Sequence, residues 1–428
     1  MRLAPSSLHG SLRDPLLGSI EFLNEVMGRF PGAISFAPGA PHPQTLEGVD
    51  THRYVDRFLD HLVHEGRSPE QARRQLLEYG PSRGIINDLV SGALRRDYGI
   101  DATPNALVVT VGAQEAMLLV LRTLFRPDDS VLAVANPCYV GIRGAARLLD
   151  LDVLPVAETD LGIDCDALEE ACRASRARGR PVRALYVAPD FSNPGGARMS
   201  LACRTRLLDL ADREDFLIVE DNAYGFTAAS GSELPPLKAL DAGRRVIHIG
   251  TFAKVAFPGA RVGFVIADQQ IDSPGGAGLL ADELAAVKSM VTVNTSPLCQ
   301  AVIGGMLLEH GGSVLELSRR RAEIYQRNLS CLTDALDRHL GDGAGPGIRW
   351  NRPLGGFFVR VQSPVPADAE LLEKSAMKYG VLWTPMRHFH LDDAGDFQLR
   401  LSCSYLGPEQ IEEGVRRLAA LLTEGCSS

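Results

Sequence analysis

Lys254 heads a set of side chains whose types and settings could do chemistry. It lies between two phenylalanines in GTFAKVAFPGARVGF (residues 250–264), directly after an apolar run. An amine in an apolar setting has a lowered pKa and becomes nucleophilic, whereas an ordinary surface lysine stays charged and solvated. Arg261 follows a Pro-Gly turn in the same segment, where it could hold a phosphate through two parallel hydrogen bonds beside the hydroxyl of Thr251.

A carboxylate and an amide follow two other apolar runs. Asp221, in VEDNAYG (residues 219–225), would be costly to bury unless a cation such as a protonated ring nitrogen paired with it; a helix cap or a salt bridge is the plainer alternative. Asn193, in DFSNPGG (residues 190–196), could donate a hydrogen bond to a ligand oxygen, although Asn-Pro alone usually marks a turn. Asp190 could face a cationic or hydroxylated substrate, or equally cap the loop.

The segment TVGAQEAM (residues 110–117) leads from a predicted strand into a predicted helix. Free backbone N–H groups at Gly112, Ala113 and Gln114, together with the helix dipole, suit an anion such as a phosphate. Taken alone, a glycine before a helix is more often an ordinary turn. With the lysine, the carboxylate and the amide, however, this anion cradle describes a site for an aromatic aldehyde phosphate.

In this order the motifs resemble those of the fold-type-I, class I/II aminotransferases. That family shows an Asn-Pro-x-Gly turn, an Asp-x-x-Tyr strand end, and Ser-Phe-Ser-Lys followed by Pro-Gly-x-Arg-x-Gly, and the match covers roughly residues 30 to 425. Two positions depart from it, because Gly195 replaces the usual Thr or Ser and Ala253 replaces a serine before the lysine. FLNEVMGRFPGAISFAPG and PDFSNP look most like the branch of 2-aminoadipate, kynurenine and dihydroxyphenylglycine transaminases.

The resemblance implies pyridoxal 5'-phosphate as the cofactor and a role for each matching position. Lys254 resembles the Schiff-base lysine that also shuttles a proton, and Asp221 resembles the aspartate that keeps the ring nitrogen protonated. Asn193 and Tyr224 match the pair that bonds the ring's 3-oxygen, and Tyr139, in NPCYVG, matches the residue that stacks on the ring. The implied phosphate contacts are Gly112, Ala113, Gln114, Thr251, Arg261 and Tyr79.

Four of the matching positions concern the substrate or a second subunit. Arg400, in FQLRLSCS, occupies the place of the arginine that pairs with the substrate α-carboxylate, and a guanidinium suits a carboxylate geometrically. Gly39, in FAPGAP, resembles the backbone that closes over bound substrate, which Asn193 would also contact. Tyr79, in LEYGPSRG, matches a tyrosine that reaches the neighbouring subunit's phosphate, so a homodimer with shared active sites is implied.

Several reactions remain open on this cofactor. The resemblance favours transfer of an amino group between a non-standard α-amino acid and a 2-oxo acid, in secondary metabolism such as antibiotic biosynthesis. The alternative is β-elimination with cyclisation, or oxidation, of a substituted basic amino acid such as hydroxyarginine. A ligand-sensing regulator is disfavoured, since only about 30 residues precede the match and such regulators place a basic winged-helix domain there.

No metal site is predicted. The eight cysteines are scattered without a Cys-x-x-Cys pair, which favours reduced thiols in a cytoplasmic protein. Arg387, His388 and His390, in TPMRHFHLDD, could line the substrate pocket, but His-x-His is more often a solvated loop than a metal site.

Composition narrows the partners to small molecules. The 428 residues are 45% hydrophobic and 23% charged, which is typical of a globular enzyme and excludes a disordered chain. A net charge of -9 argues against an extended nucleic-acid surface. No apolar run approaches the roughly 20 residues that span a bilayer, so no membrane partner is expected either.

The elements that must position these residues form an α/β pattern. From about residue 85 to 290, short β-branched runs alternate with helical stretches, which predicts a mainly parallel sheet flanked by helices, with ligand groups at the carboxyl ends of its strands. The resemblance to the fold-type-I aminotransferases implies that this sheet is of the seven-stranded type. Strands are predicted at Ala106–Val111, Val131–Ala135, Asp152–Val156, Ala184–Ala188, Phe216–Val219 and Val246–Ile249. A helical pattern over Pro297–Leu340, followed by mixed short elements, predicts a smaller α+β domain. We therefore expect an N-terminal arm or small-domain segment (1–50), a large cofactor-binding domain (51–295) and a small C-terminal domain (296–428).

Overall fold

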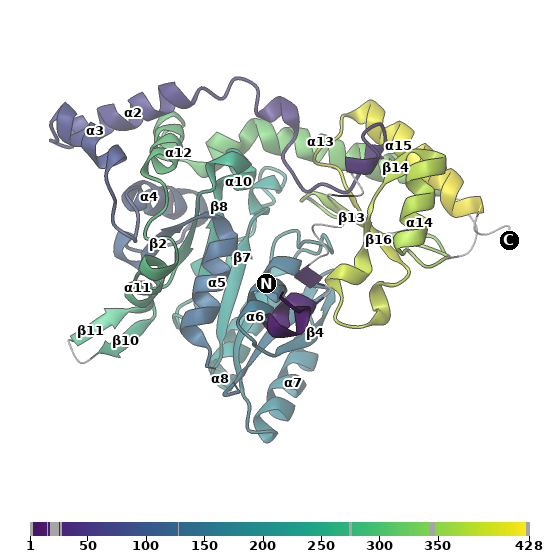
Figure 1. Ribbon diagram of the computed structural model, residues 1–428, viewed down its shortest axis with the longest axis horizontal. Coiled ribbons are helices and arrows are strands. Elements are labelled where there is room, and N and C mark those ends of the chain that lie inside the picture. Colours follow the sequence, from purple (N-terminus) through teal and green to yellow (C-terminus); the bar gives the residue numbers. More distant parts are fainter. Residues whose placement is uncertain are drawn as a thin grey trace.

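The computed structural model describes residues 3–14, 16–17, 25, 28–126, 128–273, 276–341 and 347–424. Its centre is an eight-stranded sheet with the strand order β2-β9-β8-β7-β6-β3-β4-β5 (Figure 1). The strands are β2 (Leu107–Thr110), β3 (Val131–Asn136), β4 (Val153–Thr159), β5 (Gly162–Ile163), β6 (Val182–Val187), β7 (Leu217–Asn222), β8 (Val246–Thr251) and β9 (Gly263–Ile266).

Most of this sheet is parallel, which confirms the predicted α/β class. Strands β4, β3, β6, β7 and β8 pair in parallel, whereas β9 runs antiparallel between β8 and β2, and β5 is antiparallel to β4. The six predicted strands are all present, with ends that differ by a few residues. Strand β9 was not predicted, because its first two residues end the motif that contains Lys254 and Arg261, and only Val265 and Ile266 extend it.

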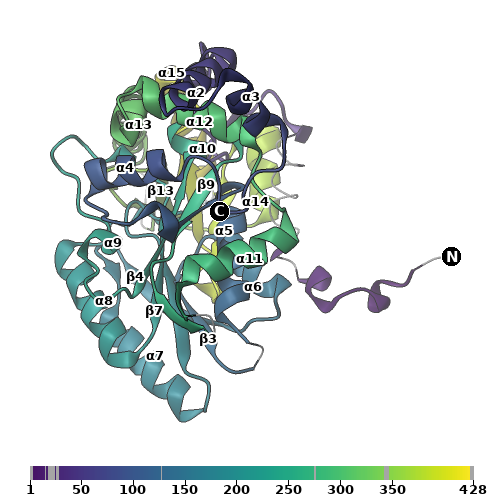
Figure 2. The same ribbon diagram turned by 90° about the vertical axis from the view of Figure 1, so that its left-hand side faces the viewer.

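Helices cover both faces of the sheet (Figures 1 and 2). On one face α5 (Gly112–Leu124), α6 (Val140–Leu148) and α11 (Leu280–Val291) share a core with strand residues such as Leu132. On the other face α7 (Cys165–Ala177) and α8 (Leu201–Glu214) pack on residues such as Ala133. Neighbouring strand residues point to opposite faces, so continuous apolar strands are buried on both sides.

A further helical group packs beside the β2 edge of the sheet. It contains α2 (Thr51–His64), α3 (Pro69–Leu77), α4 (Asn87–Tyr98), α12 (Pro297–Glu309) and the first half of α13 (Val314–Leu340). The helical pattern predicted over 297–340 is broken between α12 and α13, where Gly311 and Gly312 adopt positive φ angles of 63° and 71° that end a helix readily. Within the described ranges no single helix is long and apolar enough to cross a membrane; α12 and α13 meet that test only as a pair, bent by 87°.

A second, antiparallel sheet is built from the C-terminal part of the chain, drawn in yellow-green in Figure 1. Its strand order is β12 (Arg349–Trp350), β13 (Phe358–Gln362), β16 (Gln398–Ser402) and β15 (Thr384–Pro385). The second half of α13, α14 (Ala369–Lys374) and α15 (Pro408–Glu424) contribute to its core. The N-terminal strand β1 (Ile34–Ser35) pairs in parallel with β14 (Val381–Leu382) in this part of the molecule. The domain boundaries given above stay predictions.

The remaining elements are short. Two antiparallel strands, β10 (Gln270–Ser273) and β11 (Gly276–Leu279), form a projecting ribbon (Figure 1). Helices α9 (Leu237–Leu240) and α10 (Phe252–Val255) flank β8 in the sequence. Single turns of 3-10 helix or π-helix cover Pro5–Ser7, Gly10–Arg13, Pro43–Thr45, Pro104–Ala106, Gly225–Thr227, Pro258–Ala260, Ser375–Tyr379, Met386–Phe389 and Asp393–Gly395.

Candidate active site

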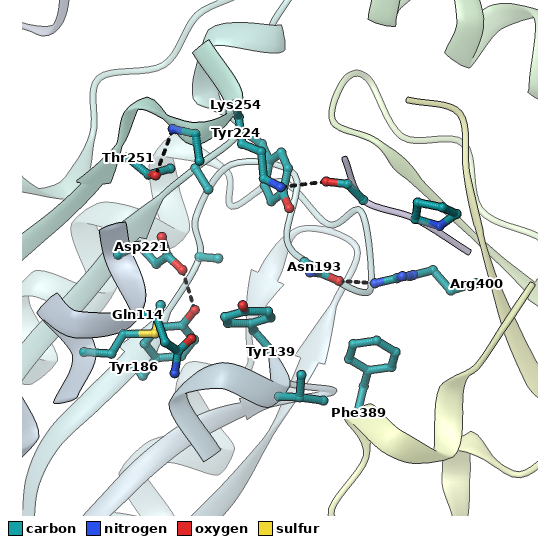
Figure 3. Close-up of a pocket in the computed structure, with 18 of the residues that line it drawn as sticks. Gln114, Tyr139, Tyr186, Asn193, Asp221, Tyr224, Thr251, Lys254, Phe389 and Arg400 are labelled. Carbon is teal, nitrogen blue, oxygen red and sulfur yellow. Dashed lines mark hydrogen bonds between the residues drawn. The ribbon is translucent and has the colours of Figure 1, made fainter. Parts of the chain in front are cut away.

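A cavity of about 340 Å³ lies at the carboxyl ends of the parallel strands, between the large sheet and the second sheet (Figure 3). Eleven of the thirteen predicted site residues line it, and the two exceptions are Gly112 and Tyr79. The lining residues are Ala37, Pro38, Gly39, Ala113, Gln114, Met117, Tyr139, Val140, Tyr186, Ala188, Asn193, Asp221, Ala223, Tyr224, Thr251, Ala253, Lys254, Arg261, Phe389 and Arg400.

Lys254 enters the cavity from α10, the single helical turn that follows β8. The hydroxyl of Thr251 starts this turn by accepting a hydrogen bond from the Ala253 N–H at 3.1 Å. The Lys254 Nζ donates a hydrogen bond to the Gly39 carbonyl oxygen at 2.6 Å. Loss of water around the amine lowers the pKa of Lys254 to about 8, and the positive charges of Arg400 and Arg261 act in the same direction. A larger fraction of this amine is therefore neutral near physiological pH than of an exposed lysine.

Asp221 is buried near the end of β7, beside β8. Its Oδ2 accepts a hydrogen bond from the Tyr186 hydroxyl at 2.6 Å, while its Oδ1 is buried without a hydrogen-bond partner. Burial raises the pKa of Asp221 to about 6, and the bond from Tyr186 opposes that rise. A buried carboxylate oxygen without a donor is costly, so it marks a position where a ligand N–H group would be stabilising.

Asn193 and Arg400 join the two halves of the cavity. The Arg400 Nη1 donates to the Asn193 Oδ1 at 2.7 Å, and its Nη2 donates to the Ala37 carbonyl at 2.8 Å and to the Thr384 hydroxyl at 3.2 Å. The guanidinium is buried, and no carboxylate is among its hydrogen-bond partners. Burial lowers the pKa of Arg400 to about 10, which is the expected response of a cation without an anionic partner.

The Arg400 guanidinium also lies between two aromatic rings. Its central carbon is 4.3 Å from the centroid of Phe358 and 4.9 Å from that of Phe389. Tyr224 packs edge-on against Phe358, with ring centroids 5.6 Å apart. Burial raises the pKa of Tyr224 and of Tyr139 above the usual value for tyrosine, so both hydroxyls stay protonated and can act as donors. Figure 3 shows the Tyr139 ring projecting into the middle of the cavity.

The predicted anion cradle forms where β2 passes into α5. Gly112 is the first helical residue and has a φ of +76°, and a Cβ built on it would lie 2.6 Å from the Arg261 Nη2. Arg261 donates to the Val111 carbonyl at 3.4 Å, so its guanidinium lies across this turn. Gln114 is anchored from its side-chain amide to the Gly141 carbonyl at 2.9 Å. Ala113 and Gln114 line the cavity at the helix N-terminus, where an anion is favoured.

Some predicted residues lie elsewhere. Tyr79 is 89% exposed and does not line the cavity of its own chain. Arg387, His388 and His390 do not line the cavity, so their possible placement in the pocket is wrong; of this segment only Phe389 lines it. Arg387 instead pairs with Asp393 and Asp396, and His390 lies 3.2 Å from Asp392. Within the described ranges no group of three His, Cys, Asp or Glu side chains could hold a metal ion.

Asp190 does not face the cavity either. It is buried and bonds to Arg204, whose Nη2 lies 2.6 Å from its Oδ1. The alternative in which Asp190 holds its own loop is therefore the one that the structure supports.

Sequence reasoning missed Tyr186 and Phe389. Tyr186 lies within the apolar strand β6 and resembles a core residue, although its position near the strand's carboxyl end could have singled it out. Phe389 lies between His388 and His390, and a phenylalanine in a loop resembles an ordinary core residue.

Comparisons with known proteins agree with this geometry. The chain matches the model of the family "Aminotransferase class I and II" over residues 53–418. It is 48% identical over 424 residues to a (S)-3,5-dihydroxyphenylglycine transaminase of Amycolatopsis orientalis, covering 99% of this chain and 95% of the relative. It is 32% identical over 397 residues to a 2-aminoadipate transaminase of Thermus thermophilus, covering 92% and 90%. Kynurenine aminotransferase of Pyrococcus horikoshii has a similar structure, with a TM-score of 0.81, 26% identity, and coverage of 100% of this chain and 96% of that one.

Proposed function

Since this chain belongs to the class I and II aminotransferase family and is a pyridoxal-phosphate-dependent transaminase, we propose that its amino donor is a neutral aromatic α-amino acid of the 3,5-dihydroxyphenylglycine type. The amino group passes to a 2-oxo acid. The relative with 48% identity, which this chain matches over nearly its whole length, is named for that substrate. Such an amino acid is non-standard, which supports a role in secondary metabolism such as antibiotic biosynthesis.

The residues of the cavity fit the cofactor. The unpartnered Oδ1 of Asp221 suits a protonated ring nitrogen, and the turn at Gly112 suits a phosphate beside the Arg261 guanidinium. Lys254, with its lowered pKa, suits an aldehyde. When bound, pyridoxal phosphate supplies an aldehyde that condenses with amines and a ring that accepts the electron pair left on the substrate carbon.

Each cofactor contact has a candidate residue. Asp221 accepts the ring N–H and keeps it protonated, while Tyr186 holds the carboxylate in place. Asn193 and Tyr224 would donate to the ring's 3-oxygen, and Tyr139 would lie against the ring. The phosphate would be held by the backbone N–H groups of Gly112, Ala113 and Gln114, and by Thr251 and Arg261.

Lys254 has two tasks in this proposal. Its neutral amine would hold the aldehyde covalently until the substrate amine takes its place. The freed amine would move a proton from the substrate α-carbon to the cofactor's C4' atom, and hydrolysis by water would then release the 2-oxo acid and leave the amino group on the cofactor. The hydrogen bond to the Gly39 carbonyl keeps Nζ inside the cavity between these tasks.

Arg400 binds the substrate α-carboxylate. Its guanidinium is buried, and aromatic rings restrict its position, so a carboxylate would meet it with little loss of side-chain freedom. Ala37 and Gly39 bring the N-terminal segment to the same place, and Asn193 orients the guanidinium.

One observation carries the choice of a neutral aromatic donor. Among the described residues, the charged groups that line the cavity are Asp221, Lys254, Arg261 and Arg400, and each has a task on the cofactor or on the α-carboxylate. Within the described part of a single chain, no lining cation is then left for an acidic side chain such as that of 2-aminoadipate. Phe389 and Val140 instead offer apolar surface beside the substrate position, which suits an aromatic ring.

The test is the half-reaction of the purified, cofactor-loaded protein with single amino donors. We expect 3,5-dihydroxyphenylglycine to yield its 2-oxo acid and the amine form of the cofactor faster than kynurenine or 2-aminoadipate does. Absorbance follows the cofactor, and mass spectrometry identifies the keto acid. Preference for 2-aminoadipate would refute the proposed substrate, and release of ammonia without a keto acid would refute the proposed chemistry.

We also propose a homodimer with shared active sites. Tyr79 is 89% exposed, and the next residue, Gly80, lies against Asn294 and Pro297. In that neighbouring segment Met290 and Val293 are 85% and 47% exposed. Exposed apolar side chains around a tyrosine that does not reach its own cavity are what a subunit interface requires.

We place the reaction in the cytoplasm. The seven cysteines within the described ranges are all free thiols, which supports a reducing compartment.

A further inference from the structure

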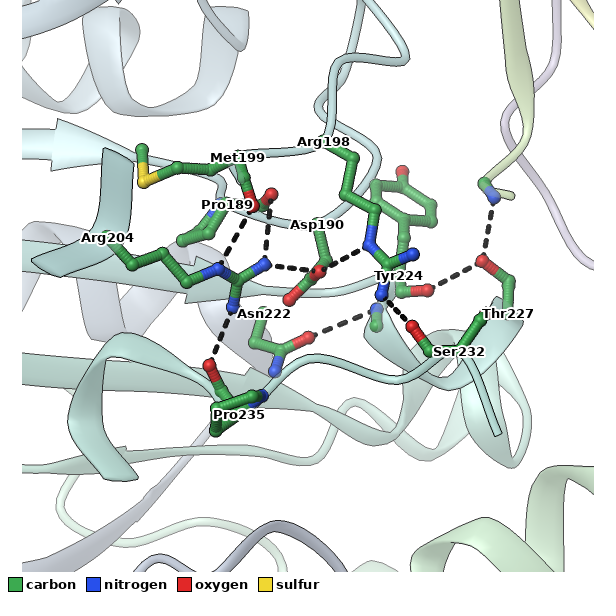
Figure 4. A network of polar contacts seen from close by, with 12 residues as sticks. Pro189, Asp190, Arg198, Met199, Arg204, Asn222, Tyr224, Thr227, Ser232 and Pro235 are labelled. Carbon is green, nitrogen blue, oxygen red and sulfur yellow. Dashed lines mark hydrogen bonds and ion pairs between the residues drawn. The ribbon is translucent and has the colours of Figure 1, made fainter. Parts of the chain in front are cut away.

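The loop that carries Asn193 is closed by a buried ionic cluster, shown in Figure 4. Asp190 begins this loop and Arg198 ends it, and the two residues form an antiparallel bridge. The Asp190 Oδ1 lies 2.6 Å from the Arg204 Nη2 and 3.6 Å from the Arg198 Nε. Asp190 therefore links both ends of the loop. Its backbone bridges to that of Arg198, and its carboxylate attracts the guanidinium groups of Arg198 and Arg204.

Arg204 ties this carboxylate to the scaffold. The Arg204 side chain is fully buried at the start of α8, and it donates to the backbone carbonyls of Met199 at 3.1 Å and Pro235 at 2.9 Å. A buried guanidinium satisfied in this way can hardly move, so Asp190 is fixed relative to the large sheet.

Arg198 extends the cluster to the other side of the loop. Its guanidinium donates to the Ser232 carbonyl, and it lies over the ring of Phe191, 5.3 Å from the centroid. Phe191 adopts a positive φ of 56° and packs so closely on Gly355 and Gly356 that a Cβ on either glycine would lie 2.5 Å from it. Such a backbone conformation is unfavourable for phenylalanine and persists only where surrounding contacts impose it.

Asn193 lies at the far end of the loop, between the cofactor position and Arg400. Its Oδ1 accepts from Arg400 at 2.7 Å, which leaves its NH2 group as the donor toward the cavity. The loop is also held from within, since the Ser192 N–H donates to the Ala197 carbonyl at 3.0 Å. A shift of the loop would therefore displace the donor to the cofactor and the partner of the substrate-binding arginine together.

We propose that Asp190 is a positioning residue for this reaction: by holding Arg198 and Arg204, it fixes the Asn193 carboxamide against Arg400 and the cofactor's ring oxygen. The inference rests on the proposed roles of Asn193 and Arg400. It gives a task to a charged residue that touches neither substrate nor cofactor.

The test compares Asp190→Asn with Asp241→Asn. Asp241 is an equally buried carboxylate, paired with the Lys238 Nζ at 2.9 Å, but it bonds the N–H of Val246 at the opposite end of β8 from the active site. Both variants lose a buried ionic partner, so thermal stability falls in both. Only a positioning role predicts that the two variants then differ at the active site.

Two readouts separate the variants. For Asp190→Asn, the KM for the amino donor rises about tenfold, because misplacing Asn193 also misplaces Arg400. The pH midpoint of the bound cofactor's absorbance change rises by about half a unit or more. A weaker hydrogen bond to the ring oxygen leaves more negative charge on that oxygen, and this charge stabilises the proton on the nitrogen that joins Lys254 to the cofactor. For Asp241→Asn, the KM and the midpoint equal those of the wild type.

The outcomes are distinguishable. If Asp190→Asn and Asp241→Asn have the same KM and midpoint, Asp190 is only structural and the inference is wrong. If the wild-type holoenzyme has no pH-dependent absorbance change, the proposed roles of the active-site residues fail instead. Should Asp190→Asn not fold, Arg198→Met at the less buried side of the cluster serves in its place, and unchanged values there overturn the inference equally.

Discussion

The chemistry of the site depends on cations that have lost most of their water. Lys254 and Arg400 share one cavity with Arg261, and both arginines lower the pKa of the lysine. An amine close to neutrality is a nucleophile and a proton carrier, whereas a guanidinium remains charged and binds an anion. Two basic side chains in one cavity can thus perform different tasks: the lysine reacts and carries a proton, and the arginine binds an anion.

Replacing Lys254 separates binding from turnover. The variant Lys254→Ala keeps the phosphate contacts and should still bind the cofactor, but it lacks the amine that forms the covalent bond and moves the proton. We expect turnover to fall at least about 10²–10⁴-fold from the lost proton transfer alone. Borohydride reduction followed by mass spectrometry should find the cofactor attached to the wild-type chain and absent from the variant. A covalent adduct in the variant would contradict the assignment.

Replacing Arg400 should affect two properties in a definite direction. The variant Arg400→Ala weakens substrate capture by about 2–5 kcal/mol, because a buried carboxylate loses its partner, and this is measured as a rise in KM. It also removes a charge that lowers the pKa of Lys254, so that pKa rises above about 8. The neutral amine then appears only at higher pH, and the pH profile of cofactor uptake by the apoprotein moves upward. Arg387→Ala, an exposed arginine outside the cavity, should change neither value.

At this scale, the polar residues of the site were predictable and its supporting residues were not. Lys254, Asp221 and Asn193 stand out because a charged or amide side chain at the end of an apolar run is costly to bury unless it has a partner. Tyr186 and Phe389 have no such contrast with their surroundings, since a tyrosine in a strand or a phenylalanine in a loop is usually core. Their contacts with Asp221 and Arg400 depend on the tertiary fold.

Among the elements, the turn from β2 into α5 shows how closely backbone and ligand site are joined. Gly112 adopts a φ of +76°, and Arg261 occupies the space beside it. A side chain at this position would be strained and would also push the guanidinium away from the anion cradle. The Glu115 carboxylate supports the turn from behind, since its Oε2 accepts from the Val111 N–H at 2.6 Å and from the buried Lys288 at 2.8 Å.

The variant pair Gly112→Ala and Gly99→Ala separates strain from displacement. Gly99 has a similar φ of +68° and nothing within 4 Å of an added Cβ, so both substitutions carry the same backbone strain of about 1–2 kcal/mol. Only Gly112→Ala displaces Arg261, and we expect its affinity for pyridoxal phosphate to fall about tenfold to a hundredfold. Equilibrium dialysis of the apoproteins measures this. Equal affinities in the two variants would mean that Arg261 does not hold the phosphate.

Strands β3, β6, β7 and β8 were predictable because each is a largely apolar run with both faces buried. Strand β9 and the break between α12 and α13 were not. The first is only four residues long and pairs antiparallel between β8 and β2, so its existence depends on its neighbours. The second depends on Gly311 and Gly312, which interrupt a pattern that is otherwise helical.

For the whole molecule, the exposed Tyr79 is the feature that a single chain leaves unexplained. If it completes the neighbouring subunit's phosphate site, two different inactive variants should complement each other. In a mixed dimer of Lys254→Ala and Tyr79→Ala chains, one of the two sites has both residues intact. Refolding the two together in equal amounts should recover roughly a quarter of the wild-type activity, because half of the dimers are mixed and each holds one complete site. Light scattering gives the oligomeric state, and no recovery from confirmed mixed dimers would exclude shared sites.

Arg400 touches four separate stretches of the chain through Ala37, Phe358, Thr384 and Asn193. The guanidinium that binds the α-carboxylate of the substrate therefore also connects the two halves of the fold. Directed evolution toward a new donor cannot exchange this residue without loosening the architecture around it. Retargeting should begin instead at Phe389 and Val140, which border the cavity and share a small apolar cluster outside the main cores.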